Sequence, residues 1–187
     1  MQNEVEKTVQ VLKRGGTILY PTDTIWGIGC DAANQKAVDK VYKIKQRIEG
    51  KSLLILVDTP ERIHDYVGNL SPVVFDLVKN YNKPLTVIYQ DAKNVAKGVA
   101  AEDRTIGIRV VQDEFCREVI RQFGKAIVST SANLSGEPPA LRFQQISEKI
   151  TSQVDYIVNL SQNEIRTMKP SRIIRISEKG DFEIIRD

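Results

Sequence analysis

Residues 126–139 read AIVSTSANLSGEPP, and this stretch passes directly from an apolar strand into a polar loop. We predict the strand over residues 126–129 and the loop over residues 130–139. Ser, Thr and Asn side chains compete with regular backbone hydrogen bonding, so they favour a tight loop with free backbone N–H groups. Such groups bind anions. The stretch therefore predicts an anion-binding loop at the end of a buried strand.

The rest of the chain alternates between the two hydrophobic periods. Val5, Val9 and Leu12 have the spacing of a helix face, whereas residues 53–57 (LLILV) form the continuous apolar run of a buried strand. Strands are expected at 17–20, 53–57, 85–89, 105–111, 126–129, 156–158 and in a C-terminal pair, and helices near 5–12, 34–47, 71–78, 113–123 and 143–150. This alternation predicts an α/β fold with helices packed on a sheet, and it leaves the strand order open.

Length and composition exclude several classes of protein. The 187 residues suit one domain, and a net charge of +3 is too small to indicate a nucleic-acid binder by bulk charge. No apolar run is long enough for a membrane span, and the N-terminus lacks the apolar segment of a secretion signal. Cys30, Cys116 and the single His64 make neither a disulfide framework nor a four-ligand zinc site. We expect a reduced, cytoplasmic, single-domain protein.

Two further segments have the composition of ligand sites. Residues 20–29 (YPTDTIWGIG) place hydroxyls, a carboxylate, Trp26 and two glycines after a predicted strand, which indicates either a turn or a ligand loop. Residues 40–51 carry five Lys or Arg against Glu49, so they form either a solvated helix face or a phosphate site. In the second case, the cations should converge on one mouth of the sheet.

Familiar nucleotide and nucleophile motifs are incomplete. Gly50-Lys51-Ser52 resembles the end of a P-loop, but Lys45 replaces the first glycine and a strand-like run follows. Gly27 and Gly29 lack a third glycine, because position 32 is Ala. A serine nucleophile has no evident base, since His64 lies in a charged segment.

The ordered set of segments resembles the YrdC-like family of threonylcarbamoyl-AMP synthases. The matching elements are PTDTIWGIG (21–29), KQR (45–47), TIGIRV (105–110), STSANLSGEP (129–138) and PSRII (170–174). The resemblance implies one YrdC-like domain over residues 1–187, with a twisted mixed sheet flanked by helices around a concave basic cavity. It implies condensation of L-threonine, bicarbonate or CO2 and ATP, with Mg²⁺, to threonylcarbamoyl-AMP and pyrophosphate. The product would serve a threonylcarbamoyl-transferase complex that modifies tRNA next to the anticodon, and members have been linked to RNA binding.

The resemblance also assigns roles to residues. Lys45 and Arg47 would hold phosphate and carry catalysis, and the amino acid would meet Thr24, Arg109, Ser129 and Ser171. The ATP-binding set would be Arg47, Lys51, Thr105, Ser131, Asn133 and Arg186. The protein ligand of Mg²⁺ stays open, with Asp23 a candidate.

Some positions depart from the family pattern, and other functions stay open. Ile48 and Ser52 stand where prolines are usual, Trp26 where Tyr is common, and Arg172 where Thr is usual. Asp187 replaces a Pro-Gly pair after the last arginine. These changes bear on loop geometry and affinity.

The main alternative is a non-catalytic module that binds double-stranded RNA or tRNA. A carbamoyl-transfer domain of the hydrogenase-maturation type and a serine amidase are the others.

Overall fold

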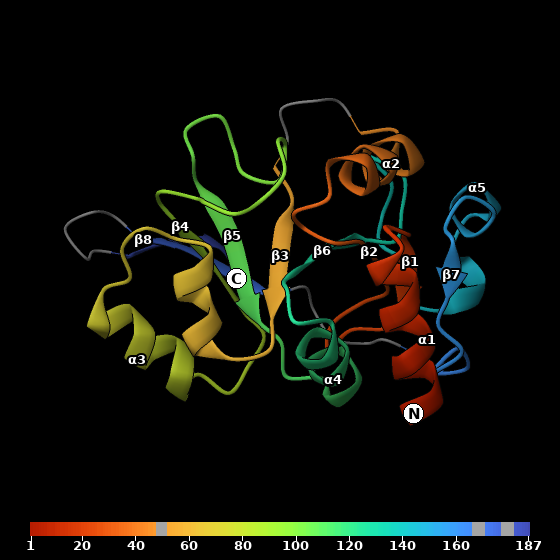
Figure 1. The fold of residues 1–187 in the computed structure, drawn as a ribbon, viewed down its shortest axis with the longest axis horizontal. Helices are drawn as coiled ribbons and strands as arrows, with labels where there is room; N and C mark the ends of the chain where they lie inside the picture. The colour runs from red at the N-terminus through yellow and green to blue at the C-terminus, as the bar shows by residue number, and fades with distance from the viewer. Residues whose placement is uncertain (48–51, 166–170, 177–181) are drawn as a thin grey trace.

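The computed structural model describes residues 1–47, 52–165, 171–176 and 182–187 (Figure 1). Its strands are β1 (Ile18–Tyr20), β2 (Gly27–Gly29), β3 (Leu54–Val57), β4 (Leu85–Tyr89), β5 (Ile106–Val110), β6 (Ile127–Ser131), β7 (Tyr156–Ile157), β8 (Arg172–Ile176) and β9 (Phe182–Arg186). In the described residues they form one mixed sheet with the order β7-β1-β2-β6-β3-β5-β4-β8-β9. The pairs β1/β7, β3/β5 and β4/β8 are parallel, and the other neighbours are antiparallel. The sheet with its flanking helices confirms the predicted fold class.

The helices cover the two faces of the sheet unequally. They are α1 (Gln2–Lys13), α2 (Gln35–Lys45), α3 (Pro72–Asn80), α4 (Glu114–Phe123) and α5 (Glu148–Thr151), with 3-10 turns η1 (Pro60–Asp65) and η2 (Phe143–Gln145). One core packs α2, α3, α5 and η1 against the strand face that carries Ile55 and Ile108. The other packs α1 and α4 against the opposite face, through Leu56 and Ile127. Strands β1, β3 and β6 contribute to both cores because successive side chains alternate in direction.

Local signals explain where the helices start and stop. Asn34 caps α2 by accepting a hydrogen bond from the Ala37 N–H at 3.2 Å, as predicted. Gln46 follows in a left-handed conformation with φ of 49°, which ends the helix before Arg47. Asp113 caps α4 in the same way, and Gly124, with φ of 81°, ends it. The chain therefore turns sharply just before the arginine of the predicted phosphate site.

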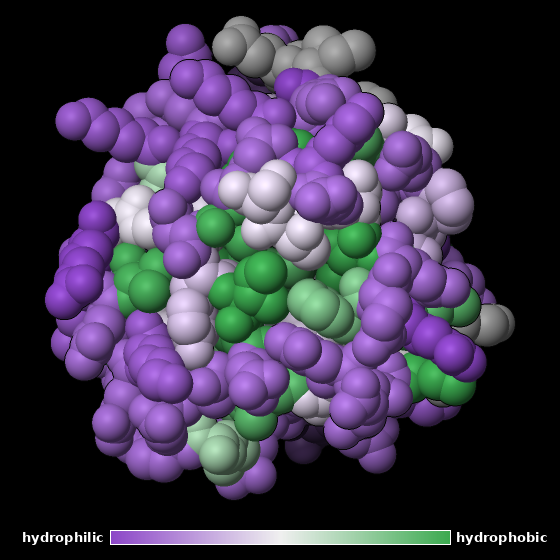
Figure 2. All heavy atoms as spheres, turned by 90° about the vertical axis from the view of Figure 1, so that its right-hand side faces the viewer, coloured by the Kyte–Doolittle hydropathy of each residue, from purple (hydrophilic) through white to green (hydrophobic). Residues whose placement is uncertain are grey.

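The structure differs from the sequence prediction in three segments. Residues 27–29 form strand β2 rather than a loop, and β6 continues two residues past 129. The helix predicted over 143–150 is instead the 3-10 turn η2 and the single turn α5. Within the described ranges, every helix is too short or too polar to span a bilayer. Figure 2 shows a mostly hydrophilic face with a central patch of hydrophobic residues on the side of α5 and β7.

Candidate active site

A cavity of about 610 Å³ lies over the part of the sheet that α1 and α4 leave uncovered. Leu54 lines it, whereas Leu56, two residues along the same face of β3, belongs to the core beneath α1 and α4. The walls come from β4, β5 and β8, from residues 22–27, and from β6 with its following loop. Segments that are far apart in the sequence therefore meet at one opening.

Most residues predicted for the site line this cavity. Those found there are Thr24, Arg47, Thr105, Arg109, Ser129, Ser131, Asn133, Ser171 and Arg186. The prediction for Lys51 lies outside the described residues, as does that for Ile48. Lys45 is described but is not among the residues that line the cavity.

Arg109 is held at one corner by two neighbours. The residue is 4% exposed, and its Nη2 lies 3.3 Å from the Asp23 carboxylate. Its Nη1 donates to the Thr24 hydroxyl at 3.2 Å, and that hydroxyl lies 3.0 Å from the hydroxyl of Thr22. Within the described residues, the Nε of Arg109 has no hydrogen-bond partner. Asp23 thus fixes the guanidinium, and this contact makes it a poor candidate for the Mg²⁺ ligand considered from the sequence.

A second arginine reaches the same corner from β9. Arg186 donates to the Ser171 carbonyl through Nη2 at 2.8 Å and through Nε at 3.2 Å. Its pKa is lowered, first by burial and then by the positive charge of Arg109. The Ser171 hydroxyl lies 2.8 Å from that of Thr86, and both residues are buried. Two guanidinium groups and a hydroxyl pair therefore share one corner, which we call the arginine corner (Thr24, Thr86, Arg109, Ser171, Arg186).

The opposite wall contains the hydroxyl-rich loop and Arg47. Asn133 donates through Nδ2 to the carbonyls of Leu134 at 2.9 Å and Glu137 at 2.7 Å, and in the described residues its Oδ1 has no partner. Arg47 donates to the Ser52 carbonyl at 2.9 Å, and its Nε has no partner in the same set. Burial lowers the pKa of Arg47. We call Arg47, Ser131 and Asn133 the loop wall.

The cavity has an excess of positive charge. Its described lining includes Arg47, Arg109, Arg175 and Arg186, against the carboxylates of Asp103 and Glu137. Asp103 accepts two hydrogen bonds from Thr105, one from N–H at 3.0 Å and one from the hydroxyl at 2.7 Å, which lower its pKa. An anionic ligand suits such a lining because guanidinium groups pair with phosphate and carboxylate in two-point geometry.

Lys45 does not line the cavity as predicted but lies beneath the loop wall. It is 2% exposed, and its Nζ donates to the carbonyls of Ser131 at 2.6 Å and Asn133 at 2.7 Å. Its own carbonyl accepts from the Ser135 N–H at 3.1 Å. Burial, with a smaller contribution from Arg47, lowers its pKa to about 8. The structure therefore favours Lys45 as a residue that holds the loop rather than as a direct phosphate ligand.

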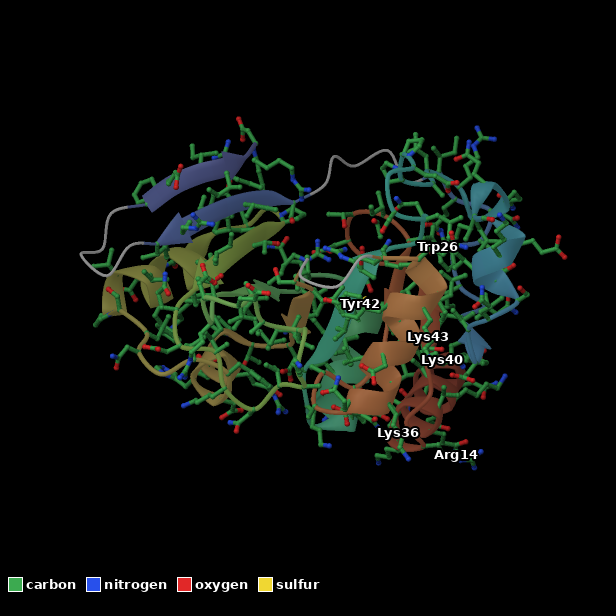
Figure 3. All side chains as sticks on the ribbon, turned by 90° about the horizontal axis from the view of Figure 1, so that it is seen from above. Arg14, Trp26, Lys36, Lys40, Tyr42 and Lys43 are labelled. Carbon is green, nitrogen blue, oxygen red and sulfur yellow. The ribbon has the colours of Figure 1, made fainter. Side chains whose placement is uncertain are left out.

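Lys40 and Lys43, the other described lysines of the basic segment, do not line the cavity. Figure 3 shows Lys40 and Lys43 on one side of α2 and Tyr42 on the other, with Lys36 and Arg14 nearby. Lys40 pairs with Asp155 at 2.6 Å. A helix places residues separated by three or four positions on one face, and that face here is not the face of the cavity. Of the predicted cluster, Arg47 is the described residue that reaches the cavity.

Gly27 and Trp26 shape the opening in different ways. A Cβ on Gly27 would lie 3.3 Å from the Ser129 hydroxyl, so the glycine keeps that hydroxyl accessible. Trp26 lines the cavity but is 1% exposed, and its ring packs 5.1 Å from that of Phe143. Its Nε1 has no partner among the described residues. The ring of Trp26 therefore contributes little exposed surface to the cavity.

Two alternatives from the sequence lose support. Strand β3 starts at Leu54, where a P-loop requires a helix. The described lining residues include neither histidine nor cysteine, and His64 is exposed on η1. Burial raises the pKa of the Cys30 and Cys116 thiols, which disfavours thiolate chemistry. The arrangement is suited to binding and positioning anions rather than to a covalent intermediate with the protein.

The lining residues that were not predicted for the site include Thr86, Asp103, Glu137 and Arg175. Thr86 had a signal in the sequence, because it is the one aliphatic hydroxyl in the strand LTVIY. Arg172 and Arg175 are separated by two apolar residues, so they lie on opposite faces of the strand. Charge alone does not indicate which of the two arginines lines the cavity. Asp103 and Glu137 are loop residues, for which sequence periodicity carries no information.

The chain is similar to known proteins in sequence and in fold. The Sua5/YciO/YrdC family, described as "Telomere recombination", matches residues 10–187. A threonylcarbamoyl-AMP synthase of Pseudoalteromonas translucida (strain TAC 125) is 32% identical over 161 residues, which cover 84% of this chain and 86% of the relative. The crystal structure of Escherichia coli YciO superimposes with a TM-score of 0.85 at 26% identity, over 100% of this chain and 90% of that one.

A more distant structure shares the fold. Pyrococcus abyssi Sua5, solved in complex with L-threonine, matches with a TM-score of 0.85 at 21% identity. The match covers 93% of this chain and 51% of Sua5, so this chain spans about half the length of that protein. Because the family match covers nearly the whole chain and the expected motif residues meet at one cavity, the chain belongs to the Sua5/YciO/YrdC family.

Proposed function

We propose that this protein is an L-threonylcarbamoyladenylate synthase. The observation that carries the proposal is the single cavity with two distinct polar walls, the arginine corner and the loop wall. A cavity of about 610 Å³ has the size of small-molecule sites in proteins. Its relatives named threonylcarbamoyl-AMP synthase support the same reaction.

The arginine corner would hold threonine. Arg109, fixed by Asp23, would bind the substrate carboxylate, with Arg186 supplying a second positive charge. Thr24 and Ser171 would bond the amino acid's polar groups, and Ser129 would lie between the two walls. The family resemblance implies that Arg186 contacts ATP, whereas its hydrogen bonds to Ser171 favour a place between the two substrates.

The loop wall would hold ATP. Arg47 would neutralise the phosphates, and Ser131, Asn133 and Thr105 would supply fixed polar groups. ATP would enter as its Mg²⁺ complex, so the ion is part of the substrate. Asp103 and Glu137 line the cavity, and one carboxylate beside the phosphates suits an ion that keeps several waters.

The chemistry needs no protein nucleophile. The amine of threonine adds to CO2, or to bicarbonate with loss of water, and gives a carbamate. A carbamate oxygen then attacks the α-phosphorus of ATP, the bond to the β-phosphate oxygen breaks, and pyrophosphate leaves. The cavity's arginines would offset the charge on pyrophosphate, and most of the rate enhancement would come from positioning and charge stabilisation.

The proposal is tested with the purified protein, ATP, Mg²⁺, bicarbonate and threonine. We expect release of pyrophosphate that stops when either threonine or bicarbonate is omitted. Pyrophosphate release that continues without threonine would contradict the assignment. The product would pass to a threonylcarbamoyl transferase that acts on tRNA, which implies a cytoplasmic enzyme.

The basic face of α2 favours a second candidate function, binding of tRNA. Lys36 and Lys43 are exposed there, with Lys40 between them and Arg14 nearby (Figure 3). Phosphate contacts of this kind weaken steeply with salt. Salt-sensitive tRNA binding that Lys36→Glu and Lys43→Glu abolish would support this function, and binding unchanged in these variants would contradict it. The two functions are compatible, because the face and the cavity use different residues.

A further inference from the structure

Thr86 is a buried residue of the arginine corner that lines the cavity, and its hydroxyl has no proposed contact with either substrate. It is 2% exposed and lies in β4, between β5, which carries Arg109, and β8, which begins directly after Ser171. On one side it pairs with Arg109 of β5, and on the other with Ile173 of β8, two residues after Ser171. Side chains directly opposite each other on neighbouring strands are in contact range. Thr86 therefore stands between the arginine and the serine of the arginine corner.

The neighbours of Thr86 fix the direction of its hydroxyl. Its methyl carbon Cγ2 lies 3.4 Å from the position that a Cβ on Gly107 would occupy, on the β5 side. Its Oγ1 lies 2.8 Å from the Ser171 Oγ, on the β8 side. Threonine has few χ1 rotamers, so contacts on both branches hold the hydroxyl toward Ser171.

The hydrogen bond between the Thr86 and Ser171 hydroxyls uses only one of their two O–H groups. Whichever oxygen donates in the pair, one O–H group and several lone pairs stay available to a ligand. Arg186 Nη2 lies 3.5 Å from the Ser171 Oγ and adds a weak donor to that oxygen. A ligand hydroxyl, which both donates and accepts, matches such a pair. A ligand with a methyl group in place of this hydroxyl would leave the buried oxygens of Thr86 and Ser171 without a ligand partner.

The strand itself does not require a hydroxyl at this position. Ile88, two residues along the same face, also lines the cavity and is apolar. Ile173 lines it on the other side of Thr86. The corner thus offers a hydroxyl pair flanked by apolar surface, which fits an amino acid whose β-carbon carries one hydroxyl and one methyl.

We propose that Thr86, paired with Ser171, is a specificity-determining residue that makes the site select an amino acid with a β-hydroxyl. The inference rests on the proposed function, because it treats the arginine corner as the threonine site. A site built to bond a substrate hydroxyl rejects analogues without it far more strongly than analogues that lack a methyl.

The test compares kcat/KM for pyrophosphate release with threonine, serine and 2-aminobutyrate, which keeps the methyl and lacks the hydroxyl. Wild type should prefer threonine over 2-aminobutyrate by at least about 100-fold. Thr86→Val keeps the shape of the side chain and should reduce that ratio at least about tenfold, because kcat/KM should fall for threonine and stay unchanged for 2-aminobutyrate. Thr86→Ser restores the hydroxyl and should keep the ratio within about threefold of wild type.

Ser171→Ala removes the other half of the pair and should reduce the ratio in the same direction. Equal losses on threonine and 2-aminobutyrate in both Thr86→Val and Ser171→Ala would overturn the inference, because they indicate structural damage rather than altered selectivity. An unchanged ratio in Thr86→Val would also overturn it. Wild type without threonine-dependent pyrophosphate release would contradict the proposed function itself, so the two failures are distinguishable.

Discussion

The arginine corner and the loop wall line one cavity but are built differently. In the corner, Arg109 is already held by Asp23 and Thr24, and Ser171 by Thr86 and Arg186. On the loop wall, the Asn133 Oδ1 and the Arg47 Nε have no partners within the described residues. The loop is fixed from behind, by Lys45. In the corner, the Arg109 Nε also lacks a partner within the described residues. The two walls therefore differ in what holds them, because the side chains of the corner contact one another, whereas Lys45 holds the loop wall from beneath.

This comparison shows that position, more than the number of charges, selects the functional cations. The lysines of α2 lie in the most basic segment of the sequence, yet Lys40 and Lys43 lie outside the cavity (Figure 3). Arg109, in contrast, is a lone arginine in an apolar strand and is almost fully buried. A buried guanidinium interacts more strongly with an anion than an exposed ammonium does, because water screens it less.

Arg47→Ala should have the largest effect and should affect the loop wall alone. Loss of the phosphate contact is expected to lower kcat/KM for ATP by about 10³-fold. The KM for threonine should stay close to wild type, because Arg109 and its partners are intact. Initial rates at varied ATP and varied threonine measure both values, and an equal rise in both KM values would remove the distinction between the walls.

Arg109→Ala should affect the arginine corner, with a rise in the KM for threonine of about 100-fold. The substitution also leaves the buried Asp23 carboxylate without its partner, which costs about 3 kcal/mol or more of stability. Asp23→Asn combined with Arg109→Ala removes that buried charge and is the control for folding. An unchanged threonine dependence in the folded double variant would rule out Arg109 as the carboxylate ligand.

Lys45→Met should lower the ATP-dependent rate by about tenfold, because the loop loses two hydrogen bonds without losing a cavity cation. Stability supplies a second readout. The pKa of Lys45 is about 8 when folded, against an ordinary value of 10.5. Between these pH values the unfolded chain binds a proton that the folded chain lacks, so the free energy of unfolding rises with pH.

Urea unfolding of wild type and Lys45→Met from pH 7 to pH 10 measures this difference. Wild type should gain stability relative to the variant as the pH increases past about 8. If the difference in the free energy of unfolding between wild type and Lys45→Met stays constant over this range, Lys45 titrates normally and is not buried beneath the loop wall. Other titrating groups are present in both proteins and cancel.

Lys43→Ala should have the smallest effect, less than about twofold on kcat/KM for either substrate. Lys43 is exposed on the outer face of α2 and is two residues from Lys45 and four from Arg47. It therefore serves as a matched control for charge removal from the same basic segment. A loss as large as that of Arg47→Ala would mean that the whole segment acts on the phosphates.

Much of the fold was predictable from local patterns, because they reflect local physics. The apolar run 53–57 is a buried strand, and Asn34 and Asp113 cap helices as predicted. Residues 143–150 were mispredicted since their apolar residues suit a helix face, yet they form two short turns. Strand β2 was missed because two of its three residues are glycines, which disfavour strands by propensity.

Most of the candidate site came from the ordered motifs, and the rest depended on tertiary contacts. No local pattern distinguishes Lys45, which lies under the loop, from Arg47, which lines the cavity, because they are two residues apart at a helix end. The left-handed conformation of Gln46, with a φ of 49°, separates the positions of these two side chains. The pairing of Thr86 with Ser171 joins residues 85 positions apart. Such contacts follow from sheet order, which the sequence left open.

The central claim is that both substrates meet in one cavity and are joined there through a carbamate. The most direct measurement is mass spectrometry of the product formed from ATP, threonine and ¹³C-bicarbonate by the purified protein. We predict an adenylate that contains threonine and carries the label. Pyrophosphate release with an unlabelled product, or with no adenylate that contains threonine, would contradict the account.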